Sequence, residues 1–361
     1  MSPLSPLDGE LMKEHPNELT AEAIRESMWP ISVMGSSKNQ DLDWKPYFKY
    51  YQDQCHSALH EQGMHILVRT HQNIIDIARK LKEGQTRDTI KDSLRALARA
   101  RQQRQNEEET LENAIDLAAR LCFMVNIGEN PSTVTRCEQL LWTSSSLKDC
   151  LEGYFSTLQA SCGDSFRFDR TFIAFNMERV AGIRICWTND LADHLRVVTD
   201  GVKRVSIFHH ASFLERAKGD SQFPVGLIDE TLRTLALLFP KQDEGTKKWL
   251  RAIRSPQTID RHLMDFQRLR SDQRQIENYT FWRERLIILK EAFDESRPAR
   301  LSQWWYDRRD GHVWYTFWVA VSVLILTVFF GFIQSIEGAL QVYKAYHPSA
   351  QCAGNTGSAY L

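Results

Sequence analysis

The sequence predicts a mainly α-helical protein with a small β-hairpin, an α+β element, and one transmembrane helix near its C-terminus. Three observations carry this prediction. Apolar residues recur at helical spacing from Trp44 to Gly128, an Asp-Gly pair at 200–201 separates two β-branched segments, and 313–333 carry no charge. Spacings of three and four residues are typical of an amphipathic helix, whereas Asp-Gly favours a tight hairpin turn.

The composition excludes several classes of protein. A length of 361 residues allows about two domains. The 45 Lys and Arg residues balance 46 Asp and Glu residues, which argues against a general nucleic-acid binder. With 42% hydrophobic and 25% charged residues, the chain is neither disordered throughout nor an all-membrane protein. Seven scattered cysteines without a CxxC pair exclude a zinc ribbon and a secreted disulfide framework.

The N-terminal third divides into two predicted parts. Residues 1–40 are proline-rich and are expected to be disordered apart from a short helix at 19–27, and they lack the pattern of a signal peptide. Residues 41–128 are predicted to form an antiparallel helical bundle. Its helices are expected near 44–84, with a bend or break at Gly63, then at 87–104 and 110–128. Glycines 84 and 128 are expected to end helices because glycine adopts positive φ.

The middle of the chain, 129–220, is predicted to be a mixed helix and strand region. Ser146 is expected to cap a helix, and a second helix is expected over 170–181. A buried strand at 183–187, a short helix capped by Thr188 and a hairpin over 196–208 follow. This order resembles a winged helix, and a generic α+β arrangement fits it equally well.

The region 221–310 is predicted to be helical again. Helices are expected at 227–238, 247–254 and 275–293, after one at 213–218. An amphipathic juxtamembrane piece at 301–305 is expected to lead into the membrane.

The strongest signal is a transmembrane helix predicted at 311–336. Its core, VWYTFWVAVSVLILTVFFGFI, holds 21 residues without a charge, which as a helix would be roughly 31 Å long and match a bilayer core. Tryptophans and tyrosines cluster at both ends, as at membrane interfaces. A core helix of a soluble domain is the alternative, but such helices usually keep a polar face. Residues expected in the span include Val313, Trp314, Trp318, Leu324, Phe330 and Ile333.

The flanking charges predict the orientation of this span. Four arginines lie within about 20 residues before it (297, 300, 308 and 309), whereas Lys344 is the only basic residue in an equal stretch after it. We therefore expect an integral membrane protein of the tail-anchored type, with a cytosolic N-terminus and a short non-cytosolic tail at 337–361. The endoplasmic reticulum or secretory pathway is favoured over the mitochondrial outer membrane, since positive charge beyond the span is sparse.

Two further patterns suggest interaction surfaces. Gly331, Ser335 and Ala339 form a stripe of small residues that would let two membrane helices approach closely, as in a homodimer. Residues Lys91, Arg95 and Arg99 line one helix face at i,i+4 spacing, which could meet anionic lipid or an acidic partner. The favoured alternative is a solvated face paired with nearby acidic residues.

No pattern predicts a catalytic, cofactor-binding or metal-binding residue. His56 and His60 share a helix face, as metal ligands can, but HSALHE lacks the HExxH order and an exposed polar face is favoured. His209 and His210 are interpreted as a loop junction, because consecutive side chains face apart on a strand or helix. The common nucleotide-binding, hydrolase and kinase motifs do not occur. We therefore expect no cofactor.

Three segments resemble a known family. They are IRICWTNDLADHLRVV at 183–198, VSIFHHASFLERAK at 205–218, and 301–348, which includes QSIEGALQVYKAYHP. In amino-acid sequence they resemble a family of uncharacterised filamentous-fungal proteins with one span and a C-terminal membrane anchor. The resemblance covers roughly the last half of the chain. It implies a fungal origin and a single span, and it transfers no site residue.

These observations favour a membrane-tethered cytosolic adaptor or interaction protein without catalytic activity, whose partner is a cytosolic protein. One alternative is a membrane-anchored winged-helix regulator that binds nucleic acid. It would need a basic recognition helix, and Glu178 weakens 170–181 in that role. An enzyme with a non-local site acting at the membrane is the other alternative.

Overall fold

The computed structural model describes most of the chain in two compact units, 1–298 and 299–361. Across the described residues it is mainly helical, with one small three-stranded mixed sheet. Each unit is described by itself. The described residues are 6–11, 16–30, 42–60, 63–100, 106–128, 140–143, 145–157, 165–253, 259–296 and 311–346.

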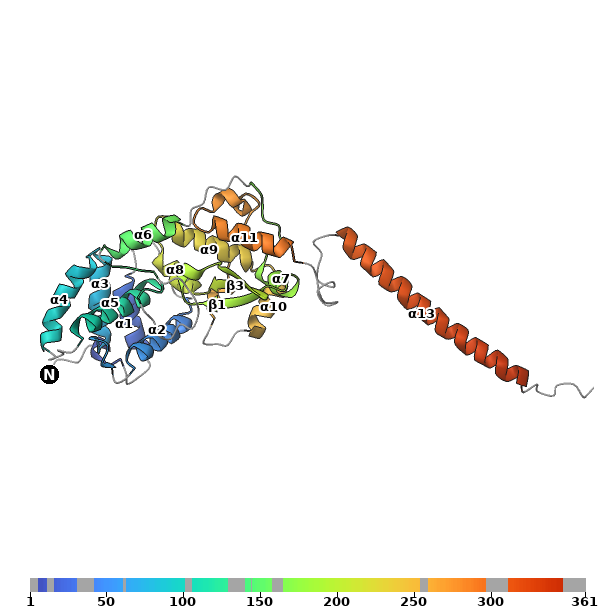
Figure 1. The fold of residues 1–361 in the computed structure, drawn as a ribbon, viewed down its shortest axis with the longest axis horizontal. Helices are drawn as coiled ribbons and strands as arrows, with labels where there is room; N and C mark the ends of the chain where they lie inside the picture. Colours follow the sequence, from blue (N-terminus) through green and yellow to red (C-terminus); the bar gives the residue numbers. More distant parts are fainter. Residues whose placement is uncertain are drawn as a thin grey trace, which may run out of the picture. The chain divides into compact units, whose positions relative to one another are not determined.

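Five helices gather at one end of the first unit (Figure 1). They are α1 (Glu18–Met28), α2 (Lys45–Ala58), α3 (His71–Lys82), α4 (Arg87–Ala100) and α5 (Glu107–Phe123). Helix α5 packs against α2, α3 and α4, and α1 packs against α3. The helical periodicity of the sequence therefore predicted the elements of this region, with α1 as an addition to the expected bundle.

Helix α1 confirms the short helix expected at 19–27 within the segment 1–40, which is otherwise expected to be disordered. Asn17 begins it by accepting a hydrogen bond from the Thr20 N–H at 2.8 Å. The structure adds that α1 packs onto the rest of the unit through an apolar face, on which Ile24 and Met28 are buried. Trp29, directly after the helix, is also buried and stacks on Trp44 with ring centroids 5.6 Å apart.

The glycine at position 63 separates two helices instead of bending one. It has φ +70°, and a Cβ there would lie 1.7 Å from an Arg69 side-chain nitrogen, so only glycine fits without rearrangement. The Arg69 Nη2 donates to the Gly63 carbonyl oxygen at 2.7 Å. At the other end of the bundle, Met124, and not Gly128, has the left-handed conformation that ends α5.

The small sheet contains β1 (Arg184–Thr188), β2 (Val197–Asp200) and β3 (Val202–Phe208) in the order β1-β3-β2. The hairpin of β2 and β3 turns at Gly201, which has φ +77°, and the prediction of this hairpin is confirmed. Strand β1 pairs with β3 in parallel, from Arg184 opposite Arg204 to Thr188 opposite Phe208. A winged helix has an antiparallel sheet, so this pairing departs from the winged-helix alternative.

Six further helices belong to the described part of the first unit. They are α6 (Leu147–Thr157), which lies between its two ends, and, around the sheet, α7 (Ala174–Arg179), α8 (Ala211–Ala217), α9 (Leu227–Leu238), α10 (Glu244–Ile253) and α11 (Arg283–Asp294) (Figure 1). The predicted bounds of α9 are confirmed, as is the Ser146 cap of α6, where the Ser146 hydroxyl accepts from the Asp149 N–H. Helix α7 is shorter than expected. Asp190, and not Thr188, caps the short 3-10 turn Leu191–Asp193.

The helix expected at 275–293 is wrong in its first half. Ile276–Asn278 form a single 3-10 turn, and α11 begins only at Arg283. The physical reason is the side chain of Glu230 on α9, whose carboxylate accepts from the backbone N–H groups of Thr280 and Trp282, each at 2.8 Å. These bonds hold the segment against α9 and occupy N–H groups that a continuous helix would need.

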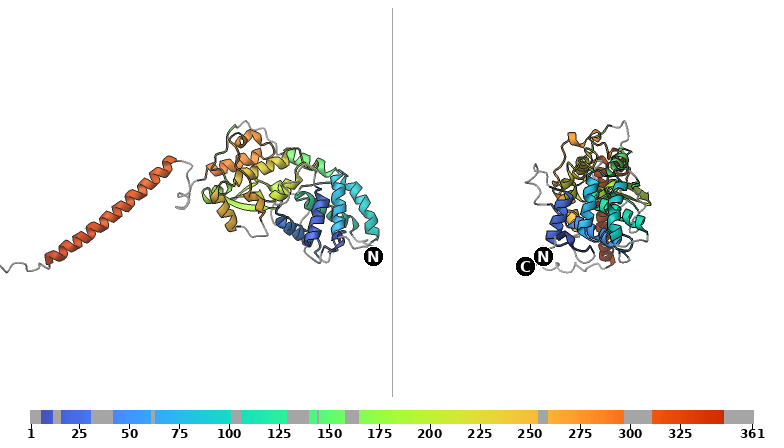
Figure 2. Two further views of the ribbon diagram at one scale, coloured as in Figure 1. Left: turned by 180° about the vertical axis from the view of Figure 1, so that it is seen from behind. Right: turned by 90° about the vertical axis from the view of Figure 1, so that its left-hand side faces the viewer.

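One hydrophobic core runs through the whole first unit. Its buried residues come from the helical end, from the sheet and from the helices around it. Figure 2 shows the two ends of this unit joined along α6. The expected boundaries at 128 and 220 therefore divide one compact unit and do not separate independent cores.

The second unit contains the helix α13 (Gly311–Tyr346), which is long and apolar. Its stretch from Tyr315 to Tyr346 has a mean hydropathy of 2.4 in its most apolar window, and this window has no buried residue. The helix extends ten residues beyond the predicted end at 336. The expected juxtamembrane piece at 301–305 and the four flanking arginines lie outside the described residues.

Candidate functional site

The predicted span residues lie on α13. Leu324 and Phe330 are 64% and 57% exposed, and Trp318 and Ile333 are half-buried. Val313 and Trp314 belong to the same helix, but their side chains lie outside the described ones. A helix of 36 residues is about 54 Å long, well beyond the roughly 30 Å of a bilayer core. By length and composition, α13 could cross a membrane.

The small-residue stripe of Gly331, Ser335 and Ala339 lies within the same helix. A Cβ added to Gly331 would meet no atom within 4 Å. The Ser335 hydroxyl donates to the Gly331 carbonyl oxygen at 2.8 Å, so its hydrogen is already bonded within the helix. The stripe therefore presents small side chains whose serine hydroxyl is already hydrogen-bonded within the helix. Its role in a dimer stays a prediction.

The basic face of α4 is largely neutralised inside the protein. Lys91 is buried, and its Nζ lies 2.8 Å from Glu108 and 2.6 Å from Glu112 on α5. Arg95 pairs with Asp92 and more distantly with Glu108, whereas Arg99 is exposed. These pairs favour the alternative of a charge-paired face over a face for anionic lipid.

The histidines at 209 and 210 come together at the carboxyl ends of the two parallel strands. Their ring centroids are 4.0 Å apart. Their Nε2 atoms lie 3.2 Å (His209) and 2.7 Å (His210) from Oδ1 of Asn189, which follows β1. The prediction that the two side chains face apart is wrong. His210 has φ −81° and ψ 67°, the inverse γ-turn, and the Ala211 N–H donates to the His209 carbonyl oxygen.

Burial keeps these histidines neutral. It lowers the pKa of His209 to about 3, and burial followed by the charge of His209 lowers the pKa of His210 well below its ordinary value. Two rings around one amide oxygen require that each Nε2 donates. The cluster therefore acts as a hydrogen-bonded junction between the two strands.

A third buried histidine supports the same junction. His194 Nδ1 accepts from the Phe208 N–H at 3.2 Å, which leaves Nε2 to donate to the Thr234 hydroxyl at 2.6 Å. Burial lowers the pKa of His194 to about 3. Nearby, burial raises the pKa of Asp190 to about 7, against hydrogen bonds from the Ala192 and Asn126 N–H groups. Arg285 donates to the carbonyl oxygens of Ala192 and His194, which ties α11 to this junction.

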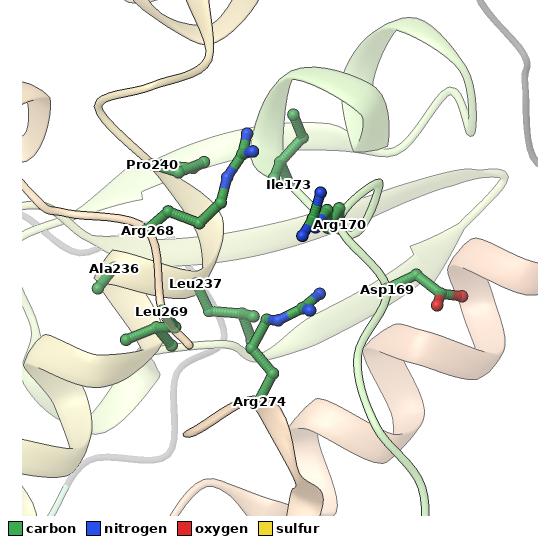
Figure 3. A pocket seen from close by; sticks show the side chains of 9 residues that line it. All are labelled: Asp169, Arg170, Ile173, Ala236, Leu237, Pro240, Arg268, Leu269 and Arg274. Carbon is green, nitrogen blue, oxygen red and sulfur yellow. The ribbon is translucent and has the colours of Figure 1, made fainter. Parts of the chain in front are cut away.

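A hollow near the end of α9 is lined by three arginines. Figure 3 shows the side chains of Arg170, Arg268 and Arg274 around it, with the carboxylate of Asp169 pointing away from Arg268. The remaining lining is apolar: Ile173, Ala236, Leu237, Pro240 and Leu269. The hollow is shallow and opens to solvent, with an enclosed space of about 10 Å³. The positive charge at its mouth would attract a small anion.

Arg274 is the buried member of this group. Its side chain is only 9% exposed, and its Nη1 donates to the Phe168 carbonyl oxygen at 2.8 Å. Its Nε is buried and has no hydrogen-bond partner among the described residues. Burial lowers the pKa of Arg274, and the neighbouring positive charges of Arg167, Arg170 and Arg268 lower it further. Sequence reasoning missed this group because Arg170 lies about 100 residues before Arg268 and Arg274, so the three form no local motif.

The expected metal-binding alternatives are not assembled in the described part of the chain. His56 is exposed on α2 while the adjacent Cys55 is buried, and His60 lies just past the helix end. Among the described residues, no group of three His, Cys, Asp or Glu side chains is placed to hold a metal ion.

Comparisons of the chain with protein-family models, curated proteins and solved structures find no match.

Proposed function

We propose that this protein is a membrane-tethered adaptor, whose helical unit 1–298 is held at the cytosolic face of a membrane by α13 and binds a cytosolic protein. The observation that carries the proposal is the exposure of α13. From Tyr315 onward none of its described side chains is buried, although the helix is strongly apolar. Apolar surface of this extent in water is unfavourable by about 25 cal/mol per Å². A bilayer would cover it.

The resemblance to fungal single-span proteins supports the same architecture. One segment on which the resemblance rests, QSIEGALQVYKAYHP, lies mostly within α13. The excess of arginine before the helix supports a cytosolic position for the unit 1–298. The endoplasmic reticulum or secretory pathway remains our favoured destination.

The first unit supports an interaction role better than the two alternatives. A nucleic-acid regulator would need a basic helix free to enter a groove, yet Lys91 and Arg95 on the basic face of α4 are paired with Glu108 and its neighbours. The parallel pairing of β1 with β3 also departs from a winged helix. An enzyme would need reactive groups open to a substrate, whereas the histidine junction is buried and serves the packing of the sheet.

Membrane extraction tests the proposal. Two arginines at the centre of the helix, Val323→Arg with Leu324→Arg, should cost at least about 5 kcal/mol on insertion scales. We expect the wild-type chain to stay in the pellet after alkaline carbonate extraction and the double variant to move to the soluble fraction. Val323→Leu with Leu324→Val, which keeps the apolar character, is the matched control. Extraction of the wild-type chain by carbonate would refute the anchor.

The adaptor role needs its own test. Full-length protein solubilised in detergent should co-purify with a cytosolic protein and should show no salt-sensitive affinity for duplex DNA. Tight DNA binding that weakens steeply between low and physiological salt would instead support the regulator.

A further inference from the structure

We propose that the hollow lined by Arg170, Arg268 and Arg274 binds a phosphate monoester group, a ligand class that the adaptor role does not require. The hollow joins residues from three places in the chain: the segment before α7, the end of α9 and the loop 268–274. Three guanidinium groups on one small space form an electropositive site, because a single carboxylate lies beside them and points away from Arg268.

The three arginines carry more charge than the protein offsets. Among the described residues none of them forms an ion pair, and the nearby Asp169 carboxylate favours the charged form of Arg274 alone. The hydrogen bond of Arg274 to the Phe168 carbonyl oxygen uses one of its five N–H groups. The buried Nε of Arg274 remains without a partner. A buried donor left unbonded is unfavourable, and an anion that accepts its hydrogen bond would relieve that.

An alternative role for these cations would be to bind the free carbonyl groups at the end of α9. The hydrogen bonds near that helix end are instead formed between backbone groups. The Phe239 N–H donates to the Leu235 carbonyl oxygen, and the Lys241 N–H donates to the Phe266 carbonyl oxygen. Arg268 meets this region through its backbone, whose N–H donates to the Gln242 side chain at 2.9 Å. Its guanidinium group is left for a ligand.

The shape and chemistry of the hollow define the ligand class. The hollow is shallow and open to solvent, with an enclosed space of only about 10 Å³, close to that of one water molecule. A ligand would therefore lie across its mouth, which the exposed residues Arg170 and Arg268 line, and one phosphoryl group suits that position better than a nucleotide, whose base would have no cavity to enter. Arginine matches phosphate in charge and in its planar, forked donor geometry. The phosphate could belong to a free phosphate compound or to the headgroup of a phosphorylated lipid.

Binding measurements on the full chain in detergent test this site. We expect isothermal titration calorimetry to detect inorganic phosphate at millimolar affinity, with chloride at equal ionic strength as the reference. Arg170→Gln combined with Arg268→Gln should weaken binding at least about tenfold, because two charge-assisted contacts are lost. Both arginines are exposed, so the fold should survive their replacement. Arg270→Gln, an exposed arginine on the same loop outside the hollow, is the matched control and should bind like the wild type.

A second titration separates the two sources of phosphate. Short-chain phosphatidylinositol 4-phosphate should bind more tightly than inorganic phosphate if a lipid headgroup is the ligand, and equally if a free phosphate compound is. Short-chain phosphatidylinositol, which lacks the monoester, should bind in neither case. The proposal is overturned if neither phosphate probe binds up to about 10 mM, or if the double variant and Arg270→Gln behave alike. Because these assays are done in detergent, their outcome is independent of whether α13 anchors the protein.

Discussion

The helices α5 and α13 are both rich in apolar residues, yet they have opposite surroundings. In α5 (Glu107–Phe123), 12 of 17 residues are buried by α2, α3, α4 and other parts of the first unit. In α13 no described side chain is buried. Apolar composition alone therefore does not predict whether the rest of the protein buries a helix. The first unit buries α5, whereas no described part of the chain buries α13.

Charged residues distinguish the two helices further. Helix α5 buries Asp116 and Arg120, which it can do because the protein provides partners. Asp116 pairs with Arg87 at 2.6 Å, and Arg120 donates to the Ile127 carbonyl oxygen at 2.8 Å. The segment 313–336 of α13 has no charged residue at all. A protein-covered helix can hold paired charges, and a membrane-covered helix avoids them.

The largest effect on α5 is expected from Asp116→Ala. This change would leave the buried Arg87, which lies over the Trp142 ring, without its ion partner. We expect the free energy of unfolding to fall by about 3–5 kcal/mol. Urea unfolding of the full chain in detergent, followed by tryptophan fluorescence, measures it. Asp92→Ala removes the exposed pair with Arg95 and should cost under about 1 kcal/mol. Equal losses in the two variants would contradict the account of α5.

Acid should destabilise the first unit through its buried histidines. Four buried histidines have lowered pKa values: about 4 for His71, about 3 for His194 and His209, and well below the ordinary value for His210. Below pH 6.5 the unfolded chain protonates these groups and the folded chain does not. The stability they confer is therefore present above pH 6.5 and is lost as the pH falls.

Three buried carboxyl groups oppose this trend. Burial raises the pKa values of Asp190 and Asp260 to about 7 and also raises the pKa of Glu230, so the folded chain keeps protons there that the unfolded chain has lost. Their contribution is present below the unfolded pKa near 4 and, for the two aspartates, is lost as the pH rises through 7. Four histidines against three acids still leave more protons on the unfolded chain near pH 5.5, so stability should fall there as the pH falls. A melting temperature that rises from pH 7 to pH 5 would contradict this balance.

Sequence periodicity predicted the helices well, because burial of one face is a local pattern. Helix α9 has the bounds expected from its apolar spacing, and the Asp-Gly turn gave the hairpin of β2 and β3. The failures occurred where distant side chains decide the backbone. Glu230 prevents a helix at 275–282, and the γ-turn at His210 brings two histidine rings together. The arginine hollow has no local signal, since only the fold brings Arg170 near Arg268.

The smallest effect concerns a possible partner for α13 within the membrane. Gly331→Ile with Ser335→Ile should weaken self-association of the span by roughly 1 kcal/mol, about fivefold, because larger side chains hold the two backbones apart. A bacterial membrane reporter of the isolated span measures it, with Phe329→Ile, away from the stripe, as the control. An unchanged signal in the double variant would show that lipid alone covers α13.

Glycosylation mapping in microsomes tests most directly whether α13 crosses the membrane and leaves the first unit in the cytosol. One acceptor site is added after Pro348 and another within 35–40, each in its own full-length variant. We predict that the acceptor after Pro348 is glycosylated and that the one at 35–40 is not, since the arginine excess before the helix holds that side in the cytosol. Glycosylation at 35–40 would contradict the account.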